Sequence, residues 1–175
     1  MNDSRRNVRI RRAEESDLEI VYEMIFEPGE GVSLEEHLSR CRSSRKLRSG
    51  DQWVLERDGA LLSSLITYRF DHPPFAPAIG IANLNTFPDQ RKQGHATTLL
   101  RGVLRELETG QGIEVFYLLS DIGTMFYERL GFRALPVSTS RHRADSVPML
   151  RCRPEAWDTT VKNRAYLRDL MMFVD

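Results

Sequence analysis

Hydrophobic residues near the start of the chain follow first a strand-like and then a helix-like spacing. Val8 and Ile10 alternate with polar residues, which predicts a short strand. Apolar side chains then recur at helical spacing over residues 18–25, which predicts a helix. Ser16 is the expected N-cap of this helix, and Glu19 is the partner that would complete a capping box. The chain is therefore expected to open with one strand and one helix.

The following segments predict a second helix and a hairpin. Ser33 and Glu36 repeat the capping-box pattern ahead of a short apolar stripe, so another helix is expected there. Residues 53–56 and 61–70 have the composition of strands. They are joined by residues 58–59, an Asp-Gly dipeptide that is typical of tight hairpin turns. The basic segment between the second helix and the hairpin is assigned no regular structure.

The second half of the chain alternates strand-like and helix-like segments. Residues 79–87 predict a strand, and the apolar positions within residues 96–107 predict a helix with one buried face. Residues 113–120 are mostly apolar, as in a strand that is buried on both faces. Gly131 can adopt the left-handed conformation and is expected to end a short helix. Two further strands and a weakly helical tail are expected over residues 133–137, 146–151 and 159–175.

This order of elements predicts a single α/β domain over residues 1–175, built on a mixed sheet. The composition, 41% hydrophobic and 29% charged, is that of an ordinary globular protein. The 25 basic and 25 acidic residues cancel, so no overall field favours nucleic acid or a membrane. Cys41 and Cys152 match no metal or redox spacing and fit reduced thiols. Because no signal peptide or membrane span is visible, we expect a cytoplasmic protein.

The segment DQRKQGHATTLL, residues 89–100, places small residues where a helix begins. Gly94 and Ala96 lack bulk, so a ligand can approach the main chain closely. The first N–H groups of a helix have no partner inside it, and the helix dipole adds partial positive charge there. Arg91 and Lys92 would add charge at the rim of this turn. The pattern predicts a site for a phosphate or pyrophosphate.

Residues 88–100 resemble the acyl-CoA-binding segment of the GNAT superfamily of N-acetyltransferases, whose motif is Q/R-x-x-G-x-G/A. Arg91, Gly94 and Ala96 occupy its three defined positions. The segment FYERLGF, residues 126–132, is similar to the second signature of that family. The resemblance extends over about residues 8–150. It implies a central, mostly antiparallel sheet flanked by helices, in which the fourth and fifth strands splay apart around acetyl-CoA.

The resemblance also implies roles for particular residues. Tyr127 matches the usual general acid, which protonates the departing thiolate of the coenzyme. The main chain of Leu84 and Thr86 would pair with the pantetheine arm. At Ser120 the sequence departs from the asparagine that is common in the family, so no pantetheine contact is transferred to that position. The pyrophosphate would be held by the turn of residues Arg91, Lys92, Gln93, Gly94, His95 and Ala96.

The general base cannot be identified from the sequence, and a chain of water molecules could replace it. The candidates are His72, Glu27 and Asp121, although Asp121 could equally be the N-cap of the helix that carries Tyr127. Asn83 and Asn85 are expected on one face of the fourth strand. They would either orient the substrate or form a hydrogen-bonded polar pair in the core.

The expected function is the transfer of an acetyl group from acetyl-CoA to a primary amine of a small molecule or peptide, without a metal. One alternative is a non-catalytic acyl-CoA-binding regulatory module of the same fold. Another alternative is a binding domain that uses a basic surface over residues 40–48. No aromatic residues are interleaved there, so nucleic-acid binding is not expected. Members of the family often dimerise, which leaves a homodimer open for this chain.

Overall fold

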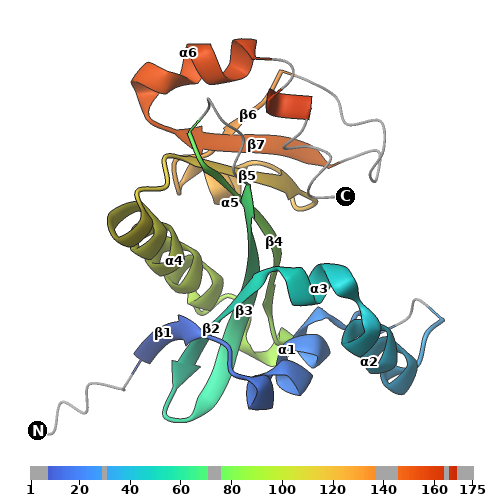
Figure 1. Ribbon diagram of the computed structural model, residues 1–175. Coiled ribbons are helices and arrows are strands. Elements are labelled where there is room, and N and C mark those ends of the chain that lie inside the picture. Colours follow the sequence, from blue (N-terminus) through green and yellow to red (C-terminus); the bar gives the residue numbers. More distant parts are fainter. Residues whose placement is uncertain (1–7, 29–30, 71–75, 137–145, 164–165, 169–175) are drawn as a thin grey trace, which may run out of the picture. The chain divides into compact units, whose positions relative to one another are not determined.

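The computed structural model describes residues 8–28, 31–70, 76–136, 146–163 and 166–168. The elements in chain order are shown in Figure 1: β1 (Val8–Arg12), η1 (Glu15–Asp17), α1 (Leu18–Ile25), α2 (Leu34–Ser43), α3 (Arg45–Ser49), β2 (Asp51–Arg57), β3 (Ala60–Phe70), β4 (Ala78–Thr86), η2 (Pro88–Gln90), α4 (His95–Gln111), β5 (Val115–Ser120), α5 (Met125–Glu128), β6 (Arg133–Ala134), β7 (Val147–Cys152) and α6 (Pro154–Lys162).

The strands form one mixed sheet in the order β1-β2-β3-β4-β5-β7-β6. The pairs β1–β2, β2–β3, β5–β7 and β6–β7 are antiparallel, whereas β4 and β5 run parallel. The parallel pairing joins residues 78–81 to residues 115–118. The mixed sheet with its parallel β4–β5 pair agrees with the predicted fold class.

The chain divides into two compact units, residues 1–67 with 83–104 and residues 68–82 with 105–175. In the first unit, α1 and α2 pack against one face of the sheet in a cluster that includes Val21, Cys41 and Val54. Successive strand residues point to opposite faces, so Leu55 and its partner Ile10 face the other way. The helix α4 covers that second face, because a Cβ atom added at Gly102 would lie 2.2 Å from Ile10 Cδ1.

The second unit has its own core. β4, β5 and β7 contribute Ala78, Tyr117 and Leu150, which are all fully buried. Tyr166 and Leu167 pack against the same cluster, and the Tyr166 hydroxyl donates a hydrogen bond to the Ala76 carbonyl at 3.0 Å. The strand β5 is buried along nearly its whole length, as its run of apolar residues predicts.

Two local predictions are wrong, and the reasons are specific. Ser16 does not cap α1, because a 3-10 turn precedes that helix and the Asp17 carboxylate accepts the Glu14 N–H at 2.7 Å instead. The basic segment forms a short helix, α3, whose N-cap Ser44 accepts the Leu47 N–H. Ser33 caps α2 as predicted, since its hydroxyl accepts the Glu36 N–H at 3.2 Å.

Candidate coenzyme site and active site

The turn that connects β4 to α4 lies on the surface and contains two left-handed residues. Lys92 has a φ of 61° and Gly94 a φ of 83°. The side chains of residues 91–93 are exposed, and Gly94 is exposed as well. A glycine tolerates this conformation without strain, whereas other residues adopt it at a cost. The turn therefore presents its main chain to solvent, as the Gly94 and Ala96 pattern predicts.

Main-chain donors are concentrated in this turn. The Thr98 N–H donates to the Gly94 carbonyl at 2.9 Å, which is the first hydrogen bond of α4. Within the described ranges, none of the N–H groups of residues 92–97 has a hydrogen-bond partner. Unpaired donors at a helix start, together with the helix dipole, attract an anion. The turn therefore has the donors that a diphosphate requires.

The end of β4 beside the turn is held on both of its edges. The Ser63 hydroxyl, fully buried on β3, donates to the Asn85 carbonyl at 2.6 Å and lies 3.0 Å from the Thr86 hydroxyl. On the other edge, the Arg91 Nε–H donates to the Thr86 carbonyl at 3.1 Å. Ser63 belongs to no recognised motif, although a serine inside the apolar run of β3 is a signal of a buried polar contact.

His95 differs from the rest of the motif because its side chain is buried, with 3% of its surface exposed. Its Nε2 atom is also buried and has no hydrogen-bond partner among the described residues. Burial, together with the nearby Arg57 guanidinium, lowers the pKa of His95 below its ordinary value. The imidazole is therefore neutral at physiological pH, and only the main chain of His95 faces the candidate anion site.

Tyr127 lies at the centre of a small aromatic group in the second unit. Its ring packs edge-on against Phe126, with centroids 4.9 Å apart, and against Phe132 at 6.0 Å. The helix α5 that carries it ends at Glu128, with Arg129 as its C-cap, and Gly131 follows with a φ of 85°, the predicted left-handed conformation. The ring is buried, and no hydrogen bond is formed by its hydroxyl within the part of the chain that is described. Burial and the nearby Asp121 carboxylate raise the pKa of Tyr127 to about 12.

Asp121 lies directly after β5 and is exposed. One of its oxygens accepts a short hydrogen bond from the Ser146 hydroxyl. Of the two roles left open for Asp121, that of helix N-cap is excluded, because the N-cap of α5 is Thr124. The Ser120 hydroxyl donates instead to the Gly123 carbonyl at 2.5 Å, which closes the loop before the helix. The other carboxylate oxygen of Asp121 has no hydrogen bond among the described residues.

The remaining candidates are placed differently from the sequence expectation. Asn83 has a φ of 50°, is exposed and interrupts the regular alternation of β4, while Asn85 is half-buried. They therefore do not form a polar pair in the core. Glu27 is exposed just after α1, and its side chain has no ion pair or hydrogen bond among the described residues. His72 lies outside the described residues.

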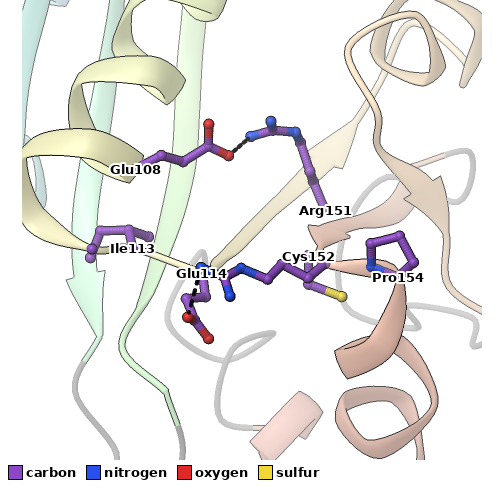
Figure 2. A pocket seen from close by; sticks show the side chains of 8 residues that line it. Glu108, Ile113, Glu114, Arg151, Cys152 and Pro154 are labelled. Atoms are coloured by element: carbon purple, nitrogen blue, oxygen red, sulfur yellow. Dashed lines mark ion pairs between the residues drawn. The ribbon is translucent and has the colours of Figure 1, made fainter.

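A separate pocket lies in the second unit, at the end of β5 opposite to Asp121 (Figure 2). Its volume is about 350 Å³. Two ion pairs, Arg151 with Glu108 and Arg153 with Glu114, line it, the latter at 3.3 Å. None of the predicted site residues lines this pocket. Within the described segments, no cluster of three His, Cys, Asp or Glu side chains could hold a metal ion, and no helix has the length and apolar character needed to cross a membrane.

Comparison with known proteins agrees with this fold. Spermidine N-acetyltransferase from Vibrio cholerae, solved in complex with CoA and spermine, is 16% identical with a TM-score of 0.63 over 83% of this chain and 95% of that chain. Ribosomal-protein-S18-alanine N-acetyltransferase from Escherichia coli is 21% identical, with a TM-score of 0.58 over 83% of this chain and 93% of that chain. A conserved protein from Enterococcus faecalis is 18% identical with a TM-score of 0.59, but its match covers 74% of this chain and only 33% of that larger chain.

The sequence itself identifies the family. The acetyltransferase (GNAT) domain model matches residues 9–135, which is well over half of the chain. No curated protein matches the sequence significantly. The chain belongs to the GNAT family of acetyltransferases, which use acetyl-CoA. The resemblance deduced from Arg91, Gly94, Ala96 and the segment around Tyr127 is thereby confirmed at the level of the family.

Proposed function

We propose that this protein transfers the acetyl group of acetyl-CoA directly to a primary amine of a small molecule or peptide. The observation that carries the proposal is the set of main-chain N–H groups over residues 92–97 that have no partner among the described residues, shortly after the end of β4. The turn holds the diphosphate, and the main chain of Leu84 and Thr86 pairs with the amides of the pantetheine arm as an added strand would.

Tyr127 supports the departure of the thiolate. The amine attacks the thioester carbonyl, the C–S bond breaks, and negative charge develops on the sulfur. A phenol of pKa about 12 stays protonated at neutral pH and can donate to that sulfur. Full transfer to a thiolate of pKa about 8.5 is uphill by roughly 5 kcal/mol. The proposed role of Tyr127 is therefore a hydrogen bond that strengthens as the charge develops, with solvent completing the protonation.

Asp121 is the proposed contact for the amine. Its carboxylate lies close enough to Tyr127 to affect the pKa of the phenol, and it is exposed. A negative charge at this position attracts an ammonium ion and orients it before deprotonation. The proton released by the amine passes to water, because no described residue is placed as a dedicated base. Glu27, Asn83 and Asn85 remain further candidates for substrate contacts.

The proposal is tested by incubating the purified protein with acetyl-CoA and a panel of primary amines that includes polyamines, amino acids and peptides. Thiol release is followed by absorbance, and the acetylated product is identified by mass spectrometry. Binding of CoA is measured separately by calorimetry. We expect thiol release that depends on one class of amine.

Two results would overturn the proposal in different ways. Binding of CoA without acetyl transfer to any amine would favour a non-catalytic acyl-CoA-binding module. A failure to bind CoA at all would remove both functions. Replacement of the exposed α4 residue Arg101 by Gln serves as the control, because this side chain has no contact in the candidate site and should leave turnover unchanged.

A further inference from the structure

Arg91 makes a contact that its position in the motif does not explain. Its side chain bends back onto β4, where Nε–H donates to the Thr86 carbonyl at 3.1 Å. A guanidinium that simply adds positive charge to an anion site would be expected to extend toward solvent. The hydrogen bond instead connects the first residue of the motif to the last residue of the strand before it.

The position of this hydrogen bond on the strand is informative. Main-chain groups of successive strand residues point to opposite edges. The Asn85 carbonyl accepts from Ser63 of β3, so the Thr86 carbonyl lies on the opposite edge. Leu84 and Thr86 are two residues apart, so their main-chain groups lie on the same edge of β4. Arg91 therefore contacts the end of the edge that also carries the main-chain groups of Leu84.

Ser63 complements this contact from the β3 side. Its hydroxyl holds both the Asn85 carbonyl and the Thr86 hydroxyl, and it has no exposed surface. The final two residues of β4 are thus fixed from both edges, immediately before a turn with two left-handed residues. A strand end that is fixed in this way presents its free main-chain groups without reorganisation when a ligand arrives.

We propose that Arg91 is a positioning residue for coenzyme binding, which acts through its hydrogen bond to the Thr86 carbonyl rather than through its charge on the diphosphate. This inference rests on the proposed function. Arg91 fixes the end of the strand edge that receives pantetheine and fixes the start of the turn that receives the diphosphate. The contribution of Arg91 to coenzyme binding then depends on its Nε–H group and not on the positive charge of the guanidinium.

Three substitutions separate the N–H group from the charge. Arg91→Gln places an amide nitrogen at the same number of bonds from Cα as Nε, without a charge. Arg91→Lys keeps the charge but places a methylene group at that position, and Arg91→Met has neither donor nor charge. Loss of a hydrogen bond to a charged group is expected to raise the KM for acetyl-CoA about tenfold in the Lys and Met variants. The Gln variant should stay within about threefold of the parent protein.

The readouts are chosen so that a general loss of stability cannot imitate this pattern. KM and kcat are measured separately, and kcat should be unchanged in all three variants. Thermal unfolding is recorded for each, and Arg101→Gln on the exposed side of α4 should change neither parameter. A Lys variant that binds the coenzyme as well as the Gln variant, or better, would overturn the inference. So would three variants that are all equal to the parent or all equally impaired.

A measurement without coenzyme separates this inference from the proposed function. In the free protein, the NMR signal of the Arg91 Nε–H should be protected from exchange with solvent, and the protection should be unchanged by high salt. A protected Nε–H in a protein that fails to bind CoA would reject the proposed function and leave the arginine contact standing. A rapidly exchanging Nε–H would reject the inference, whatever the activity.

Discussion

The turn before α4 and the aromatic group around Tyr127 contribute different parts of the chain to the proposed chemistry: main-chain groups in the turn and a side chain at Tyr127. The turn is exposed, and the donors that it offers to a ligand belong to the main chain. Tyr127 is buried and packs edge-on against Phe126 and Phe132, and the proposed chemistry uses its hydroxyl. In the first region the backbone conformation is what matters, and in the second the identity of one side chain.

This difference predicts which substitutions each region tolerates. The exposed side chains of Lys92 and Gln93 should be replaceable as long as the left-handed conformations at positions 92 and 94 are kept. Around Tyr127, small changes of the backbone conformation should have little effect on activity. Removal of the Tyr127 hydroxyl oxygen should abolish most of the activity. The following substitutions test that contrast, from the largest expected effect to the smallest.

Tyr127→Phe should have the largest effect. It keeps the packing of the ring and removes the hydroxyl, so kcat should fall about 100-fold while coenzyme binding is unchanged. Tyr166→Phe is the matched control, because Tyr166 is also buried and its pKa is also raised to about 12. That variant loses the hydrogen bond to Ala76 and about 1 kcal/mol of unfolding free energy, but should keep its turnover. Equal turnover in Tyr127→Phe and the parent protein would exclude the proposed role.

Gly94→Ala tests whether the backbone of the turn matters. A Cβ atom at this position would meet nothing within 4 Å, so the substitution adds strain at a φ of 83° without a clash. We expect about 1 kcal/mol of lost stability and a roughly tenfold weaker affinity for CoA, because the N–H groups no longer converge. Gly112→Ala imposes similar strain at a φ of 65°, also in open space, and should leave the affinity for CoA unchanged. Equal affinity in both variants would contradict the role of the turn.

The raised pKa of Tyr127 predicts a dependence of stability on alkaline pH. Burial and Asp121 favour the protonated phenol in the folded state. The associated stability is therefore complete below pH 10, the ordinary value, and is lost as the pH rises toward 12. At about pH 11 the parent protein should have lost roughly 1 kcal/mol more than Tyr127→Phe, as measured by denaturant unfolding. Identical profiles for the two proteins would show that the phenol is not buried as described.

Lys92→Asn should have the smallest effect. Asparagine tolerates a left-handed φ and removes the charge of this exposed side chain. Affinity for CoA should fall about threefold at low ionic strength and recover its parent value at high salt, because exposed charges are screened. A loss that persists at high salt would show that this side chain, rather than the main chain, holds the ligand.

The sequence predicted most of the elements and the family because their signals are local. Gly131 adopts a left-handed φ after α5 by its own conformational freedom, and the apolar run of β3 is visible without knowledge of any partner. The contacts around the site were not predictable in this way. The bonds from Ser63 to Asn85 and from Ser146 to Asp121 join residues far apart in the chain. The left-handed conformation of Asn83 was also missed, because a strand pattern does not specify where the regular backbone of a strand is interrupted.

The central claim is that the free main-chain N–H groups of residues 92–97 bind the diphosphate of the coenzyme. It is tested most directly by following the backbone amide signals of the ¹⁵N-labelled protein by NMR during titration with CoA and, separately, with pantetheine, which lacks the diphosphate. We predict that CoA shifts the amides of residues 92–97 downfield and that pantetheine leaves them in place while it shifts Leu84 and Thr86. Amides 92–97 that do not move at saturating CoA would contradict the account.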